Sequence, residues 1–165
     1  MNTASGVLIV HSAPQAVLSH VEWAVNGVLG APQKFRWTDQ AAEPGMARCS
    51  LYWSGPRGSA ARIASNLAGW QDVRFESIED ASRFSAGLHV MHTPSLGLHT
   101  VATDEAGAFV LSEHVLDRII ADCGADGRRL AAEIEKALGR PWDHELEQYR
   151  RGEEAGQVSW MTRVG

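Results

Sequence analysis

The sequence has little cysteine and no long apolar run, and each shortage argues against a class of protein. Its only cysteines, Cys49 and Cys123, lie far apart and outside any CxxC pair. This favours a reducing compartment over a disulfide framework. The N-terminus lacks a basic region, and its apolar run at residues 7–10 is too short for a signal peptide or a membrane span. We therefore expect a cytoplasmic protein.

Positive charge is also scarce. Residues 1–100 hold 7 basic and 7 acidic side chains, whereas residues 101–165 hold 8 and 13 and so carry the whole net charge of −5. An acidic chain without a basic stripe lacks the attraction that drives binding to nucleic acids or to anionic membranes. We expect neither of these as a partner.

What is present is the composition of an ordinary globular protein. With 165 residues, 44% of them hydrophobic, the chain has the length of about one domain. A chain of this size buries about 70% of the surface that its unfolded form exposes, which is enough for a core without metal or disulfides. No repeat and no flexible linker divides it. We predict a single compact domain over residues 1–165, and a division into subdomains at 1–82 and 83–165 stays open.

The first half of the chain alternates between two hydrophobic periods. Period-two or fully apolar runs predict strands, and three- and four-residue spacing predicts helices. The resulting order is β-α-β-β-α-β, which is typical of a ferredoxin-like split βαβ fold with an antiparallel sheet and both helices on one face. The expected strands are residues 6–11, 34–39, 47–54 and 72–78, and the helices are residues 14–29 and 59–70.

The second half predicts an additional α+β part. Short strands are expected at residues 87–93, 98–103 and 108–111. A helix capped by Ser112 should end at Gly124, and another over residues 128–138 should end at Gly139. The segment from Pro141 to Asp143 indicates a turn, followed by a short helix to about Arg151 and a last strand at residues 157–164. The fold class is therefore α+β.

A glycine-rich turn leads from a strand into a helix and is the best candidate for a small-anion site. Backbone amides at a helix N-terminus attract anions, and an arginine beside them adds positive charge. The turn lacks the GK[ST] of a P-loop and is too short for GxGxxG. The competing interpretation is a loop with a helix cap. The residues concerned are Ser54, Gly55, Arg57, Gly58 and Ser59.

Three histidines within eleven residues, His89, His92 and His99, raise the question of a metal site. On a strand, residues 89 and 92 point to opposite faces, and no Asp, Glu or Cys stands among the three. We therefore expect no metal and no other cofactor.

Ser12, with His11 or His20, has the residue types of a nucleophile and its base. However, Ser12 is not in a GxSxG motif, and no acid in a recognisable motif would orient the base. We predict no catalytic residue, and a non-enzymatic role is favoured.

Two tryptophan-containing segments are candidates for partner binding, because tryptophan is enriched at interface hot spots. His20 and Trp23 share a helix face that differs from the apolar stripe of the same helix. Trp142 and Asp143 precede a charged helix that includes Tyr149. The alternative for both segments is packing within the chain, and the second also fits a lid that closes the core.

Three segments, residues 11–14, 20–30 and 138–147, carry a resemblance that extends over nearly the full length. On these segments the chain resembles an actinobacterial family known only as a domain of unknown function. The resemblance implies no activity, catalytic residue or cofactor. Genes of that family often stand beside fatty-acid synthesis genes, which implies a role in acyl-chain metabolism.

These observations lead to one functional hypothesis and one alternative. The first is a non-catalytic accessory or regulatory module that binds a protein partner, such as a fatty-acid metabolism enzyme. The alternative is a sensor or enzyme that binds a small anion, a nucleotide or an acyl-CoA, at the turn of residues 54–59.

Overall fold

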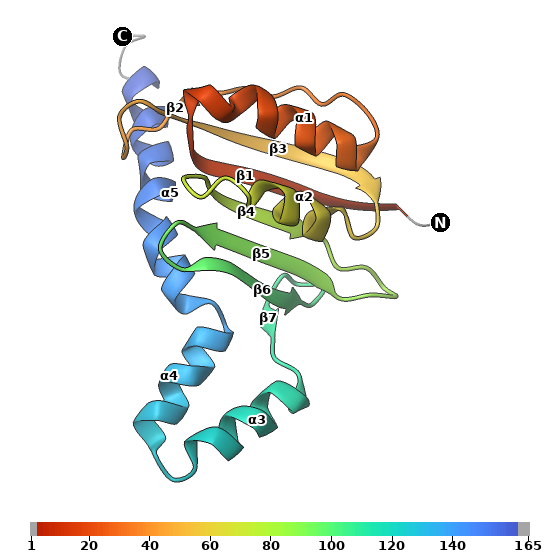
Figure 1. Cartoon of the computed structure of the whole chain (residues 1–165), viewed down its shortest axis with the longest axis vertical. Helices are drawn as coiled ribbons and strands as arrows, with labels where there is room; N and C mark the ends of the chain where they lie inside the picture. Colours follow the sequence, from red (N-terminus) through yellow and green to blue (C-terminus); the bar gives the residue numbers. More distant parts are fainter. Residues whose placement is uncertain (1–2, 162–165) are drawn as a thin grey trace.

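The computed structural model describes residues 3–161 as one antiparallel sheet with helices on both faces (Figure 1). The mixed α+β class is confirmed. Seven strands follow the spatial order β2-β3-β1-β4-β5-β6-β7. Their bounds are β1 (Thr3–Pro14), β2 (Thr38–Asp39), β3 (Met46–Pro56), β4 (Arg74–Glu79), β5 (Gly87–Thr93), β6 (Gly97–Thr103) and β7 (Phe109–Val110). The α-helices are α1 (Leu18–Leu29), α2 (Ser59–Leu67), α3 (Glu113–Cys123), α4 (Gly127–Ala137) and α5 (Arg140–Met161).

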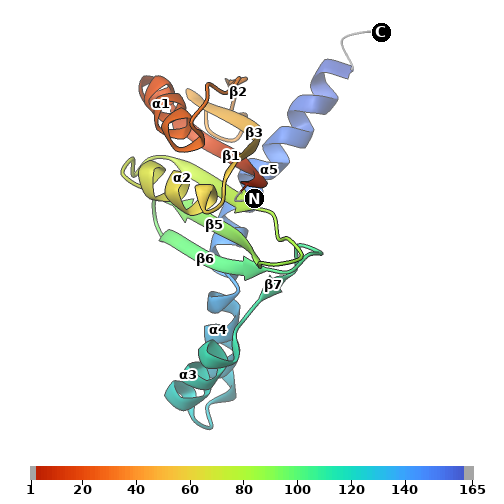
Figure 2. The same ribbon diagram turned by 90° about the vertical axis from the view of Figure 1, so that its right-hand side faces the viewer.

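The main core lies between the sheet and the helices α1 and α2, which cover the same face (Figure 2). β1 lies between β3 and β4, and β3 lies between β1 and β2, so the connections through α1 and α2 each pass over one strand. The predicted apolar stripe of α1 faces this core through Val21, Val25 and Val28. α1 ends at Gly30, whose φ of 72° is the left-handed conformation that glycine adopts without strain.

The opposite face of the sheet is crossed by α5 (Figure 2). There Trp142 and Leu146 of α5 pack with Met91 and Val101 of the sheet in a second, smaller core. The two helices before α5, α3 and α4, form a hairpin that extends beyond the β7 edge (Figure 1). As predicted for Ser112, its side chain caps α3 by accepting a hydrogen bond from an amide of the first turn.

The C-terminal segment corrects the expectation of a turn, a short helix and a last strand. α5 begins at Arg140 and continues as one helix to Met161, so Pro141 lies in its first turn, where proline costs no hydrogen bond. Residues 157–161 of the expected strand are therefore helical, and residues 162–164 lie outside the described part. The alternation at 157–164 was too short to decide between the two periods.

The strand expected at residues 34–39 is also shorter than its pattern indicated. Only Thr38 and Asp39 pair with β3. The alternation before them is nevertheless real, because Phe35 and Trp37 stack on each other and pack against the core while Lys34 and Arg36 are exposed. The alternation reflects which side chains are buried, and such burial does not require that the segment be hydrogen-bonded to a neighbouring strand.

The sheet is continuous between the two parts of the sequence, because β4 pairs with β5 along its length. Residues 80–86, where a subdomain boundary was left open, form the connection between these two neighbouring strands. Among the described helices, none combines the length and the apolar character that crossing a bilayer requires.

Candidate functional site

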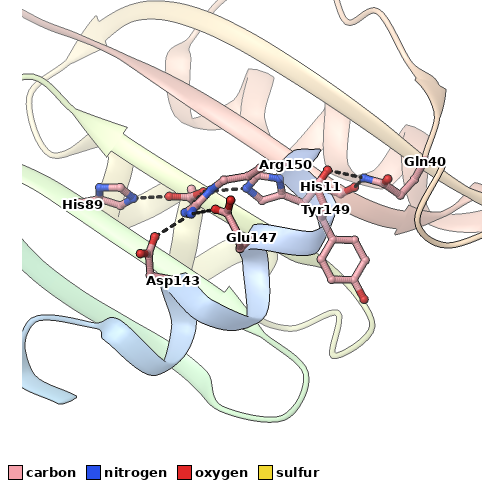
Figure 3. Close-up of polar contacts among 8 residues, drawn as sticks. His11, Gln40, His89, Asp143, Glu147, Tyr149 and Arg150 are labelled. Atoms are coloured by element: carbon pink, nitrogen blue, oxygen red, sulfur yellow. Dashed lines mark hydrogen bonds and ion pairs between the residues drawn. The ribbon is translucent and has the colours of Figure 1, made fainter. Parts of the chain in front are cut away.

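The most concentrated polar arrangement surrounds Glu76 of β4, whose carboxylate is contacted by Arg150 of α5. Figure 3 shows the side chains of Arg150, His11 and His89, which converge from α5, β1 and β5. His11 of β1 donates from Nε2 to Oε1 of Glu76 at 2.7 Å, and His89 of β5 donates from Nε2 to Oε2 at 2.6 Å. Arg150 of α5 donates to the same Oε1 from Nε at 3.0 Å and from Nη2 at 2.7 Å. Glu76 therefore joins three strands and a helix.

The carboxylate of Glu76 is ionised although its residue is only 3% exposed. Burial alone would raise the pKa of Glu76, because it removes water from the charged form. The hydrogen bonds from His11 and His89 and the positive charge of Arg150 outweigh burial, and together they hold the pKa of Glu76 far below its usual range. The cluster is thus built to keep one negative charge inside the protein.

Arg150 links this buried charge to the acidic side of α5. Its Nη1 donates to Oδ1 of Asp143 at 2.6 Å and lies 3.6 Å from Oε2 of Glu147. Burial would lower the pKa of Arg150, but the charges of Glu76 and Asp143 and the hydrogen bonds to them raise it. The guanidinium therefore stays charged and holds α5 against the sheet.

The position of His11 is fixed on two sides. The amide of Gln40 donates to the carbonyl oxygen of His11 at 2.6 Å, and Gln40 is itself buried. Because a carboxylate only accepts hydrogen bonds, the Nε2 that faces Glu76 carries a hydrogen. Nδ1 of the same ring is buried with no hydrogen-bond partner among the described residues.

Ser12 does not pair with an imidazole. Its hydroxyl donates to Oε2 of Glu43 at 2.5 Å, and Nη1 of Arg74 donates to the same oxygen at 3.0 Å. Within the described chain, His11 uses its Nε2 on Glu76, and His20 stacks on a tryptophan. The Ser–His nucleophile that the sequence raised is therefore not assembled here.

The loop expected to bind an anion already binds one from the chain itself. The backbone amide of Gly58 donates to both carboxylate oxygens of Glu79, at 3.0 and 2.9 Å, and that of Ala60 donates to Oε2 at 3.3 Å. Arg57 instead donates to the hydroxyls of Ser82 and Ser85. An external anion would have to compete with Glu79 for the same amides.

Other residues of this loop act within the turn. Ser59 is buried, and its hydroxyl donates to the carbonyl oxygen of Pro56 at 2.6 Å. Gly55 packs closely on α1, since a Cβ there would lie 2.8 Å from a methyl carbon of Leu29. Ser54 is exposed at the end of β3.

The three clustered histidines lie in different surroundings. His89 faces Glu76, whereas His92 lies on the other face of β5, donates from Nδ1 to the carbonyl oxygen of Val73 at 2.7 Å and stacks on Phe75. His99 on β6 stacks on Trp142. Among the described residues, no group of three or more His, Cys, Asp or Glu side chains is arranged to hold a metal ion.

The expected partner-binding residues separate into exposed and buried ones. Trp23 is 78% exposed on α1, and His20 is exposed one turn before it, where it stacks on Trp70. By contrast, Trp142 and Tyr149 are buried against the sheet by the first turns of α5. In this structure the pair packs within the chain, and its role in partner binding stays a prediction.

Asp143 lies between these two cases, because it is half-buried and holds Arg150. The indole of Trp142 donates to the carbonyl oxygen of Gly97 at 2.8 Å, and the guanidinium of Arg74 lies 4.8 Å from the ring centre of Tyr149. All three residues thus fix the position of α5.

Sequence reasoning missed Glu76, His89 and Arg150 as members of one site. Arg150 stands 74 positions from Glu76 in the chain, and no local motif spans that distance. One signal was available. Glu76 is a charged residue between Phe75 and Ser77 of an alternating strand, and a strand with neighbours on both sides can bury a carboxylate only beside donors.

These features define a class of protein: an antiparallel α+β protein whose sheet is joined to its C-terminal helix by a buried, ion-paired carboxylate. The chain belongs to the family described as "Protein of unknown function (DUF3145)", whose pattern matches residues 7–163. The comparisons with curated proteins and with solved structures each found no match.

Proposed function

We propose that this chain is a non-catalytic accessory or regulatory module that binds a larger enzyme in the cytoplasm of actinobacteria. The observation that carries the proposal is the contrast between its polar and its apolar groups. The ionisable side chains that converge in the interior are paired with each other, whereas a large aromatic side chain, Trp23, stands exposed above a groove. We also propose that this enzyme acts in acyl-chain metabolism, and this link rests on the gene neighbourhood that the family resemblance implies.

The groove lies between α1 and α2 on the outer side of the helix layer. It has a volume of about 450 Å³ and a mostly apolar lining of small side chains, with Trp23 on one wall. Tryptophan is one of the residue types that most often dominate the binding energy of an interface. His20, on the same helix, extends this surface.

Arg62 gives the groove its charge preference. It is the one ionisable residue in the lining, and its Nη2 donates only to the carbonyl oxygen of Val28 at 3.3 Å and to Oγ of Ser59 at 3.5 Å. Within the described part of the chain it has no carboxylate partner. The occupant we propose is therefore a helix of the partner enzyme that presents an apolar side chain beside a carboxylate.

The test is affinity purification from the native host with wild type and two surface variants. Trp23→Ser and Tyr52→Ser are a matched pair, because Tyr52 is 84% exposed on a strand of the sheet rather than in the groove. We expect one enzyme to co-purify with wild type and Tyr52→Ser and to be lost with Trp23→Ser. The enzyme is then purified, and its affinity is measured by titration calorimetry against wild type and Arg62→Glu.

Arg62→Glu should weaken the binding of that enzyme by about tenfold or more, because it places like charges opposite each other. A partner that depends equally on Trp23 and Tyr52 would contradict the proposal. So would a self-associated chain that Trp23→Ser converts into a monomer in sedimentation experiments, since the occupant would then be a second copy.

A further inference from the structure

A second hollow lies where the α3–α4 hairpin meets the rest of the protein, and it differs in character from the α1–α2 groove. Its volume is about 340 Å³, within the range of small-molecule sites. The residues that line it come from α3 and α4, which form its walls, and from β6 and the start of α5, which form its floor. Residues from four elements therefore converge on one space.

Positive charge predominates around this hollow. Arg118 of α3 and Arg129 and Lys136 of α4 line it, together with the carboxylates of Asp122 and Glu133. None of the three cations forms an ion pair with a described residue. Three unpaired cations on facing helices, on an otherwise acidic chain, provide a local attraction for an anion.

Two aromatic side chains, His99 and Trp142, contribute to the floor. The rings of His99 and Trp142 stack with centroids 4.5 Å apart and planes inclined by 27°. Nε2 of His99 donates to the carbonyl oxygen of Ala137 at 3.0 Å, and the indole of Trp142 donates to Gly97, so both rings are held in place. Burial lowers the pKa of His99, which keeps its ring neutral. A planar ligand ring can pack against the aromatic atoms of these two residues that line the hollow.

The turn between α4 and α5 brings this floor and these walls close together. Gly139 has a φ of 76°, and a Cβ at that position would lie 2.3 Å from the methyl carbon of Met91 and 2.9 Å from the ring of His99. Only glycine permits the helix end to approach β5 and β6 so closely. The shape of the hollow is therefore built into the backbone.

We propose that this hollow binds a nucleoside monophosphate or a ligand of the same chemistry, an anion attached to a flat ring. The ring stacks beside His99 and Trp142, and the phosphate lies among Arg118, Arg129 and Lys136. The carboxylates of Asp122 and Glu133 accept hydrogen bonds from ligand hydroxyl or amino groups. This site is distinct from the groove of the proposed partner and from the turn of residues 54–59.

The experiment is titration calorimetry of the full chain with adenosine monophosphate, with adenosine and inorganic phosphate as its two halves. We expect adenosine monophosphate to bind more tightly than either half. Arg129→Gln and Lys136→Gln should each weaken it by about tenfold or more, the effect of losing a hydrogen bond to a charged group. Arg128→Gln is the matched control, because Arg128 is exposed on α4 outside the lining of the hollow.

Three results would overturn the proposal. The first is the absence of binding at millimolar nucleotide. The second is an equal loss of affinity in Arg128→Gln and Arg129→Gln, which would indicate nonspecific electrostatic attraction rather than a defined binding site. The third is binding of inorganic phosphate as tight as that of the nucleotide, which would show that His99 and Trp142 do not contribute to the affinity.

Discussion

Glu76 occupies a position in which an isolated charge would be unstable, and its neighbours make it stable. A buried carboxylate without partners would take up a proton. Here donors on β1, β5 and α5 all meet its two oxygens. Removing one member of such a cluster leaves the others buried and unsatisfied, so the effect on stability should exceed that of a surface pair.

We expect Glu76→Gln to lower the free energy of unfolding by about 3 kcal/mol at pH 7, because it breaks a buried pair. Urea denaturation followed by circular dichroism measures the change. Glu147→Gln is the control. This variant removes the half-exposed ion pair between Glu147 and the same arginine, and it should lower the free energy of unfolding by about 1 kcal/mol or less.

The same variant should alter the dependence of stability on pH. Folding lowers the pKa of Glu76 below the value of about 4.3 in the unfolded chain. The folded state therefore binds fewer protons, and the stabilisation is complete above about pH 4.3 and declines as the pH falls further towards the folded pKa. The difference between wild type and Glu76→Gln should shrink between pH 5 and pH 3, and an unchanged difference would contradict this assignment.

At the scale of elements, α2 begins in an unusual way. Its N-cap residue is Gly58, which has no side chain to cap the helix, and Glu79 from the neighbouring strand β4 supplies the carboxylate instead. This arrangement satisfies the amides that a helix N-terminus leaves free and also complements the helix dipole. The start of α2 is therefore coupled to the end of β4.

Glu79→Ala should lower the free energy of unfolding by about 1–2 kcal/mol, as the loss of a cap does. Asp72→Ala, an exposed acidic residue before β4, serves as the control and should change stability by less than about 0.5 kcal/mol. Added sulfate should stabilise Glu79→Ala more than wild type, because it can take the vacated amides. Equal stabilisation of both proteins would contradict this account.

α5 depends on its apolar side as well as on Arg150. Leu146 is fully buried in the second core, whereas Gln148 on the same helix is exposed. Leu146→Ala should therefore cost about 2–5 kcal/mol in unfolding free energy, and Gln148→Ala less than about 0.5 kcal/mol. Both values can be measured by urea denaturation. Similar losses in the two variants would show that the helix packs differently.

Local patterns predicted the elements whose ends carry their own signals. Gly30 and Ser112 marked helix boundaries that the structure confirms, because left-handed glycine and a serine cap act on adjacent backbone. The prediction for the start of α5 was wrong, because Pro141 is compatible with a turn and also with the first turn of a helix. The cluster of Glu76 and Arg150 could not be predicted either, because its donors come together only when strands and helix pack.

At the scale of the whole molecule, one sheet crosses the middle of the sequence. β4 and β5 pair over five residue positions, from Phe75↔His92 to Glu79↔Leu88. The two cores lie on opposite faces of this sheet and share its strands. If either half of the sequence unfolded, the paired strand edge of the other half would be exposed.

We therefore expect a single cooperative unfolding transition for the full chain. Tryptophan fluorescence and far-ultraviolet circular dichroism, followed together in urea, should give coincident curves. Transitions with separate midpoints would instead indicate that residues 1–82 and 83–165 unfold as independent units.

The two outermost strands, β2 and β7, are only two residues long each. β3 is paired with β2 only at Ala47 and Arg48, and β6 with β7 only at Ala102 and Thr103. Along the rest of their length, the outer sides of these two longer strands pair with no described strand. Fibril growth by lateral addition needs an extended border to copy. The outer sides of β3 and β6 are thus the borders of this sheet at which such lateral addition would begin.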